Sequence, residues 1–320
     1  MSVHERGSRG AVRLAAVDTG TNSTRLLVAD VAGERILRQH AREMVITRLG
    51  KGVDRTGRFD PAAVRRTLEV LAGYAERCAR LGVEAARVVA TSATRDASNR
   101  EEFLDGVRRL FGVDAEVLTG GQEAATTYTG ATHDLPGDER TLVVDIGGGS
   151  TEFIIGNHDP EAMLSLDIGC VRLFERHLAG DPPAPAEVEA LRLDVRQQLG
   201  KVQAVLDPTS AKRVVGVAGT VTTVTAIALD LDTYDPERIH RATIEVARIN
   251  RTAERLAAMT IAERAALPVM AKGREDVIAA GALVLDEICR SFGFQRLTAS
   301  ETDILDGVLL GLARRLAGSG

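Results

Sequence analysis

Two carboxylates flank a run of three glycines near the middle of the chain. Asp145 ends an apolar, β-branched run, Gly147–Gly149 follow, and Glu152 begins a second apolar run. Apolar runs bounded by glycine predict a buried strand, a tight turn and a second buried strand. Glycine amides can approach an anion without a Cβ in the way, and carboxylates beside a bound anion call for a cation between them. The pattern favours a phosphate and Mg²⁺ site, although a glycine hairpin with ordinary polar caps has the same signature.

The same unit occurs once before, near the N-terminus. The two copies align without a gap, so that Asp18, Gly20, Ser23 and Thr24 match Asp145, Gly147, Ser150 and Thr151. A repeated strand–turn–strand unit predicts a duplicated domain, and two facing hairpins would hold one phosphate chain from both sides. The copies differ at an informative position, because Arg25 stands where the later copy has Glu152. One turn would supply a cation for phosphate oxygens, and the other an anion for a metal.

Three further junctions place polar residues where a strand meets a helix. Ser92 and Arg95 follow the apolar run 87–90, Glu123 lies in the first turn of a predicted helix, and Gly219–Thr220 follow another apolar run. Helix N-termini bind anions, so these residues are candidates for phosphate contacts, and Glu123 is a candidate base for an attacking water. A capping box, a carboxylate complementing the helix dipole, and a packing glycine explain the same residues without function.

Composition narrows the class of protein. A length of 320 residues predicts about two domains. The net charge is −5 and tryptophan is absent, which argues against a nucleic-acid-binding surface. The three cysteines are widely spaced without a CxxC pair, which predicts neither disulfides nor a zinc site and favours the cytoplasm. No apolar run is long enough for a membrane span, and the polar residues 1–10 predict a short lead-in rather than a signal peptide.

Strands and helices alternate along the chain, which predicts an α/β protein. Asp60 and Pro61 predict an N-cap and first helical residue, with helical apolar spacing to Leu81. Residues 50–57 are predicted to form an exposed loop, and residues 186–206 a helix.

Four motifs in this order resemble the Ppx/GppA phosphatase family, the exopolyphosphatases and guanosine pentaphosphate phosphatases. They begin at Asp18 (DTGTNSTRL), Ala90 (ATSATRDASN), Thr119 (TGGQEAA) and Asp145 (DIGGGSTE). The resemblance covers essentially the whole chain and is to the short form, without an added C-terminal helical domain. It implies two ribonuclease-H-like domains of the actin, Hsp70 and sugar-kinase superfamily, with the active site in the cleft between them. The boundaries we predict are 1–122 plus 302–320 for domain I and 123–301 for domain II.

The resemblance also implies roles for individual residues. Glu123 corresponds to the catalytic glutamate, and Asp145 and Glu152 to the Mg²⁺-site carboxylates. The residues implied to contact phosphate are Asp18, Gly20, Thr21, Asn22, Ser23, Arg25, Ser92, Arg95, Gly147, Gly148, Gly149, Ser150 and Thr151, and to these we add Gly219 and Thr220 as the floor for the distal part of the ligand. The chain departs from the family pattern at Ala124, where a second glutamate is frequent, and at 301–307, where the family often has a Gly-Leu-Arg-Glu-Gly run.

The predicted reaction is Mg²⁺-dependent hydrolysis of the terminal phosphate of inorganic polyphosphate. Polyphosphate is preferred because the residues placed so far contact phosphate and none is an obvious guanine reader. Guanosine pentaphosphate remains the alternative substrate. A sugar-kinase-type transferase using ATP and a non-catalytic nucleotide sensor share the scaffold, but the Glu123 motif favours hydrolysis. The resemblance further implies a homodimer, and the sequence predicts neither a nucleic-acid nor a membrane partner.

Overall fold

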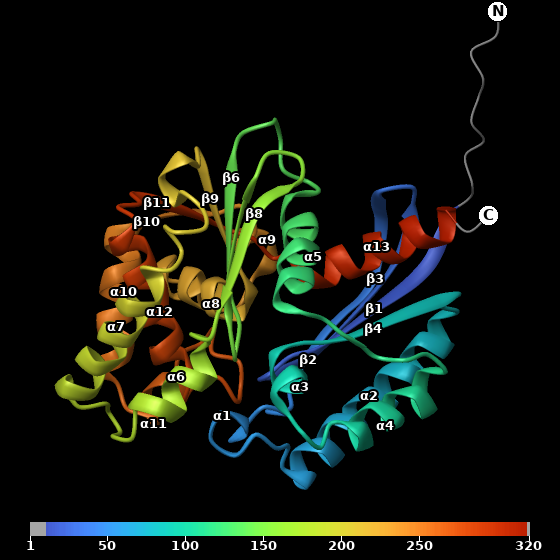
Figure 1. The fold of residues 1–320 in the computed structure, drawn as a ribbon, viewed down its shortest axis with the longest axis horizontal. Coiled ribbons are helices and arrows are strands. Elements are labelled where there is room, and N and C mark those ends of the chain that lie inside the picture. Colours follow the sequence, from blue (N-terminus) through green and yellow to red (C-terminus); the bar gives the residue numbers. More distant parts are fainter. Residues whose placement is uncertain (1–10, 319–320) are drawn as a thin grey trace, which may run out of the picture.

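Two β-sheets organise the computed structural model, which describes residues 11–318 (Figure 1). The lead-in predicted for residues 1–10 lies outside the described residues. The first sheet has the strand order β3-β2-β1-β4-β5. Its strands are β1 (Val12–Thr19), β2 (Ser23–Ala32), β3 (Arg35–Ile46), β4 (Ala85–Ala90) and β5 (Glu116–Val117).

The second sheet repeats this topology. Its order is β10-β11-β9-β6-β7-β8, with strands β6 (Thr141–Ile146), β7 (Thr151–Gly156), β8 (Pro160–Leu166), β9 (Arg213–Val217), β10 (Thr243–Glu245) and β11 (Arg296–Ala299). In both sheets the first three strands are antiparallel, and the next two continue parallel to the first. Strand β10 is an additional antiparallel edge. The predicted α/β class and the two ribonuclease-H-like units are confirmed.

Helices cover the sheets on both faces. The helices up to the second sheet are α1 (Val53–Thr56), α2 (Pro61–Leu81), α3 (Ser92–Asp96), α4 (Glu101–Phe111) and α5 (Gly120–Thr132). Those that follow are α6 (Cys170–His177), α7 (Pro185–Leu199), the 3₁₀ helix η1 (Pro208–Ser210), α8 (Ala218–Ala228), α9 (Pro236–Ile239), α10 (Val246–Ala258), α11 (Ile261–Ala265), α12 (Ile278–Ser291) and α13 (Ile304–Gly318). Within residues 11–318, none of these helices combines the length and the apolar character that a membrane span requires.

Local sequence signals explain most of the helix boundaries. The Asp60 side chain accepts a hydrogen bond from the Ala62 amide at 2.7 Å, so α2 begins as predicted. The exposed loop predicted at 50–57 is wrong in part, because it contains α1 and the side chain of Val53 is buried. The helix predicted at 186–206 ends at Leu199. The apolar spacing continues beyond that point in buried side chains, but Gly200, the least favoured helix former after proline, begins a series of turns.

The alternation of side chains along the strands determines where the polar residues point. On β1, Ala15 and Val17 pack toward α2 and α4, whereas Leu14 and Ala16 pack toward α13. On β6, Val143 packs in a cluster with residues of α5. Because side chains two residues apart share a face, Asp18 lies on the α13 face of its sheet and Asp145 on the α5 face of its own. Helices α5 and α13 lie between the two sheets (Figure 1), so both aspartates point into the region where the halves meet.

Candidate active site

A crevice between the two halves is lined by the turns of both hairpins. The predicted site residues that line it are Asp18, Gly20, Thr21, Asn22, Ser23, Arg25, Ser92, Glu123, Asp145, Gly147, Gly148, Gly149, Ser150, Gly219 and Thr220. They come from five segments of the chain. The structure therefore brings nearly the whole predicted set into one crevice, while their individual roles in binding remain predictions.

The two turns have the same internal geometry and touch each other. Gly20 N donates to Ser23 O at 2.9 Å, and Gly147 N donates to Ser150 O at 3.0 Å. A Cβ added to Gly148 would lie 3.0 Å from Thr21 Cβ, and backbone of the first turn lies almost as close. A side chain at this position would press against the first turn, so the close approach of the two turns favours glycine.

Three predicted residues do not line the crevice, and their contacts explain why. The Thr151 hydroxyl is buried and donates to Ile168 O at 3.0 Å, so it secures the hairpin instead of facing the crevice. Glu152 is 1% exposed, and its Oε1 accepts a hydrogen bond from Ser165 Oγ at 2.7 Å. Arg95 lies behind Glu123 and reaches the crevice only through it.

Glu123 is placed by the first turn of α5 and held by Arg95. The helix begins with a capping box in which Thr119 and Gln122 bond reciprocally, which orients the turn that carries Glu123. Glu123 Oε2 accepts a hydrogen bond from Arg95 Nη1 at 2.5 Å, and the same Nη1 donates to Leu118 O at 2.8 Å. Burial raises the pKa of Glu123 to about 7, against the opposing effect of Arg95. A carboxylate with this pKa is suited to general base catalysis near neutral pH.

Asp145 and Glu152 lie opposite each other across the β6–β7 hairpin. Burial, together with the charges of Asp303 and Glu123, raises the pKa of Asp145 to about 7. Burial, Glu123 and Asp145 raise the pKa of Glu152 well above its usual range. Thr127, one turn after Glu123 on α5, donates to Asp145 Oδ2 at 3.2 Å. Carboxylates this close to one another lose their mutual repulsion when a cation binds among them.

The residues present fit a hydrated divalent cation. Within residues 11–318, no three His, Cys, Asp or Glu side chains converge into a complete metal cage. Mg²⁺ does not require one, since it commonly binds through one or two carboxylates and completes its shell with water and substrate phosphates. Asp18 Oδ1 is also buried and, among the described residues, has no hydrogen-bond partner. The acidic donor set of the crevice is therefore appropriate for Mg²⁺.

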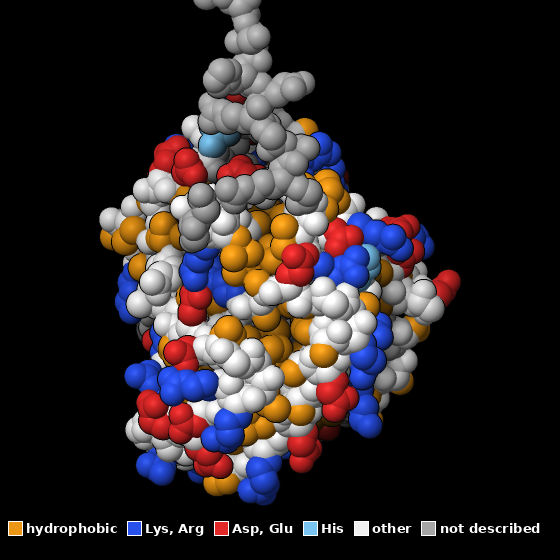
Figure 2. Space-filling view, turned by 90° about the vertical axis from the view of Figure 1, so that its right-hand side faces the viewer, with side chains coloured by type: hydrophobic (Ala, Val, Ile, Leu, Met, Phe, Trp, Pro, Cys, Tyr) orange, Lys and Arg blue, Asp and Glu red, His pale blue; other side chains and the backbone are white. Residues whose placement is uncertain are grey.

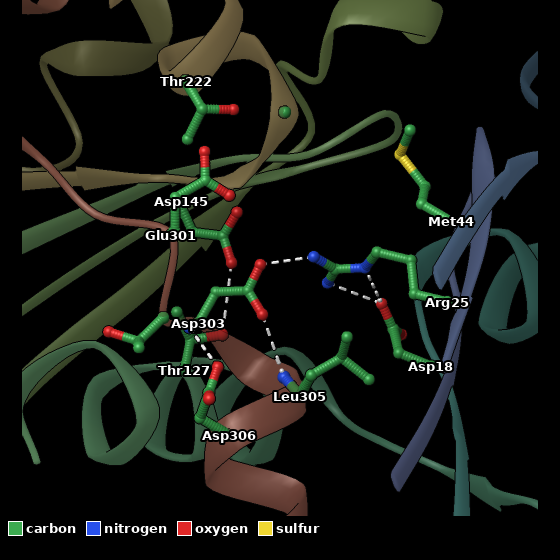
Figure 3. A network of polar contacts seen from close by, with 12 residues as sticks. Asp18, Arg25, Met44, Thr127, Asp145, Thr222, Glu301, Asp303, Leu305 and Asp306 are labelled. Carbon is green, nitrogen blue, oxygen red and sulfur yellow. Dashed lines mark hydrogen bonds and ion pairs between the residues drawn. The ribbon is translucent and has the colours of Figure 1, made fainter. Parts of the chain in front are cut away.

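Arg25 bridges two carboxylates from opposite ends of the chain (Figure 3). Its Nη2 and Nε donate to Asp18 Oδ2 at 2.8 and 3.1 Å, and its Nη1 forms an ion pair with Asp303. Asp303 precedes α13, where its Oδ1 accepts from Leu305 N at 3.0 Å and caps the helix. The guanidinium is thereby fixed at the edge of the crevice, on the strand position that corresponds to Glu152 in the other hairpin.

Sequence reasoning missed Arg274, Asp303 and Thr127. Arg274 lines the crevice, donates to Gly219 O at 3.2 Å and to Thr223 Oγ1 at 3.1 Å, and among the described residues has no carboxylate within ion-pair distance. A Cβ on Gly219 would lie 1.9 Å from Arg274 Nη2, so the glycine makes room for the guanidinium. Arg274 stands in a connector before α12 without any motif. For Asp303, the departure from the family pattern at 301–307 was a usable signal.

Comparisons with known proteins agree with this geometry. The profile of the Ppx/GppA phosphatase family matches residues 26–316. Exopolyphosphatase 2 of Mycobacterium tuberculosis is 44% identical over 316 residues, covering 94% of this chain and 98% of that protein. The crystal structure of an exopolyphosphatase-like protein is 35% identical with a TM-score of 0.92, covering 97% of this chain and 100% of that one.

The crystal structure of an exopolyphosphatase from Cytophaga hutchinsonii is 26% identical with a TM-score of 0.87, covering 95% of this chain and 98% of that one. The match to the family profile and these relatives each extend over nearly the full chain. The chain therefore belongs to the Ppx/GppA phosphatase family.

Proposed function

We propose that this protein is an exopolyphosphatase that hydrolyses the terminal phosphoanhydride bond of inorganic polyphosphate. The observation that supports this most directly is the crevice itself, in which two glycine turns, the cations Arg25 and Arg274 and the carboxylate of Glu123 lie together. Amides and guanidinium groups suit an anionic chain, and a buried carboxylate suits activation of water. The exopolyphosphatases among its relatives point to the same substrate.

In the proposed mechanism, this chain's residues hold the terminal phosphoryl group and direct a water molecule at it. Amides of the turns and the Arg25 guanidinium bind the phosphoryl oxygens, whose charge spreads in the transition state. Glu123 accepts the proton of the water, and Arg95 fixes the carboxylate that does so. Mg²⁺, held through Asp145 and Glu152, would supply charge neutralisation at the phosphate oxygens.

The substitution Glu123→Gln tests this assignment. The amide retains the shape of the side chain and a hydrogen-bond acceptor for Arg95, but it cannot take a proton. We expect phosphate release from polyphosphate to fall by about 10²–10⁴-fold, with the unfolding temperature and the affinity for inorganic phosphate near those of the wild type. Near-normal phosphate release would remove Glu123 from the role of base.

Guanosine pentaphosphate is the second candidate substrate, and a cavity next to the crevice supports it because it could hold the nucleoside. This cavity shares Arg25, Gly219 and Arg274 with the crevice, and its further lining includes Met44, Pro236, Tyr234, Pro268 and Met270. Such a lining suits a nucleoside next to a phosphate chain, whereas a bare polyphosphate has no group to place there. Phosphate release from the two substrates at matched Mg²⁺ concentration distinguishes them.

We further propose that the protein forms a homodimer and acts in the cytoplasm. We also propose the domain boundaries given above, 1–122 plus 302–320 for domain I and 123–301 for domain II. Figure 2 shows one side of the molecule, on which apolar side chains form a band among charges of both signs. Leu37 and Leu316 are 54% and 43% exposed, which supports a contact with a second copy. The three cysteines are free and buried, which supports a reducing compartment. Light scattering of the purified protein tests the dimer.

A further inference from the structure

The start of α6 holds the glycine turn of the second hairpin from behind. The three glycine carbonyls all accept hydrogen bonds from this segment: Cys170 N to Gly147 O at 2.9 Å, Val171 N to Gly148 O at 2.9 Å, and Arg172 Nε to Gly149 O at 2.8 Å. In a trans peptide the C=O and the following N–H point in opposite directions. The amides of the next residues, Gly148, Gly149 and Ser150, are therefore directed away from α6, on the side of the crevice that these residues line.

The contact between α6 and the turn is too close for any side chain. A Cβ added to Gly169 would lie 2.4 Å from both the carbonyl carbon and the oxygen of Gly148. Gly169 N also donates to Gly149 O at 3.3 Å. The turn is thus seated against the backbone that precedes α6, and its orientation depends on this seat.

The Arg172 guanidinium joins this turn to the other half of the molecule. While Nε bonds to Gly149 O, Nη2 donates to Asp96 Oδ2 at 2.6 Å and approaches Ser92 Oγ at 3.5 Å, and Nη1 forms an ion pair with Asp54. Asp96 and Ser92 belong to α3 and Asp54 to α1, both in the first half. The Arg172 side chain is 11% exposed and does not line the crevice.

We infer that Arg172 is a positioning residue for phosphoryl transfer, because its guanidinium fixes the distance between the glycine turn 147–149 and the α3 segment that contains Ser92. The inference rests on the proposed function. Arg172 touches neither the substrate nor the reacting atoms, and it acts through the turn amides that bind them. Its planar guanidinium bonds to Gly149, Asp96 and Asp54 simultaneously, which the single ammonium of a lysine cannot do. Geometry, and not only positive charge, is therefore what the reaction requires at this position.

The experiment compares Arg172→Gln and Arg172→Lys with Arg176→Gln as the matched control. Arg176 lies one turn further along α6 and also pairs with Asp54, at 3.4 Å, but makes no contact with the glycine turn. We expect kcat for polyphosphate to fall about 10–100-fold in both Arg172 variants, as for other ångström-scale misplacements, and to remain within about threefold of the wild type in Arg176→Gln. Full activity of Arg172→Lys, or an equal loss in Arg176→Gln, would overturn the inference.

Asp96→Asn supplies a test that does not depend on the Arg172 variants folding well. It removes the charge of the anchor on α3 and leaves the bond from Arg172 to Gly149 and the ion pair with Asp54 in place. We expect kcat to fall for this variant also, and the double variant with Arg172→Gln to be no more than about twofold slower than Arg172→Gln alone, because both changes break one linkage. Independent, multiplying effects would contradict the linkage.

A second measurement separates this inference from the proposed function. Calorimetric titration with inorganic phosphate requires no turnover, and we expect affinity to fall at least about tenfold in Arg172→Gln but not in Arg176→Gln. If the wild type binds phosphate but releases none from polyphosphate, the proposed function fails while the positioning role is still measured. Equal phosphate affinity in the wild type and Arg172→Gln, or no binding by either, overturns the inference.

Discussion

Helices α5 and α13 contact each other through two glycines, Gly130 and Gly307, and this contact predicts the effect of Gly130→Ala on stability. A Cβ added to Gly130 on α5 would lie 1.7 Å from Asp303 O and 2.6 Å from Gly307 N, and one added to Gly307 would lie 1.9 Å from Thr126 O. These atoms belong to the backbone, so they cannot move aside as a flexible side chain would. Gly130→Ala must therefore push the two helices apart. Overpacking of this kind costs about 1–3 kcal/mol of unfolding free energy.

Gly73→Ala is the matched control, because Gly73 also lies inside a helix, α2, but its added Cβ meets nothing within 4 Å. Alanine is favoured over glycine in a helix by about 0.5–1 kcal/mol, so this variant should be more stable than the wild type. Because Gly130 is also helical, that gain is common to both variants, and they should differ by the overpacking cost of about 1–3 kcal/mol. Urea denaturation followed by circular dichroism measures this difference, the chain having no tryptophan.

Activity should follow the displacement in Gly130→Ala. Asp303, at the start of α13, holds Arg25, whereas Glu123 is carried by α5. Moving one helix relative to the other misplaces the cation relative to the base, at a cost of up to about 10²-fold in kcat per ångström. A Gly130→Ala variant as stable and active as Gly73→Ala would refute the view that the contact between α5 and α13 determines the position of Arg25 relative to Glu123.

Two further predictions concern the carboxylates. Because burial raises the pKa of Glu123 from 4.5 to about 7, the folded protein retains a proton that the unfolded chain loses, so its metal-free stability should fall as pH rises between these values and then level off. Mg²⁺ should accordingly raise the unfolding temperature more at about pH 8 than at about pH 5, and equal shifts would count against a cation among these groups. Ser165→Ala removes the hydrogen-bond donor to Glu152. The Mg²⁺ concentration for half-maximal activity should therefore rise about 10–100-fold. An unchanged Mg²⁺ dependence would mean that Glu152 does not need the hydrogen bond from Ser165.

The strands, the duplication and most of the residues that line the crevice could be predicted from the sequence, because these features depend on local signals. Alternating apolar residues determined the faces of β1 and β6, and the glycines marked both turns. Arg274 and Arg172 were not identified as site residues. Each is placed by partners more than 50 residues away, such as Gly219 for Arg274 and Asp96 for Arg172. A single arginine side chain has no period and no motif, whether it stands in a connector like Arg274 or on a helix like Arg172, so only the folded chain reveals its partners.

The duplication also explains why the two hairpins contribute different charges to the crevice. In both hairpins an aspartate ends the first strand and pairs across the turn, Asp18 with Arg25 and Asp145 with Glu152. The first pair neutralises itself, and Asp303 adds a further negative charge beside Arg25. The second pair consists of two buried acids next to Glu123, whose repulsion is relieved by a bound proton or, at higher pH, by an added cation. We therefore propose that one substitution between otherwise matching hairpins places the metal in the half that carries Glu123, and leaves the other half to hold phosphate oxygens with an arginine.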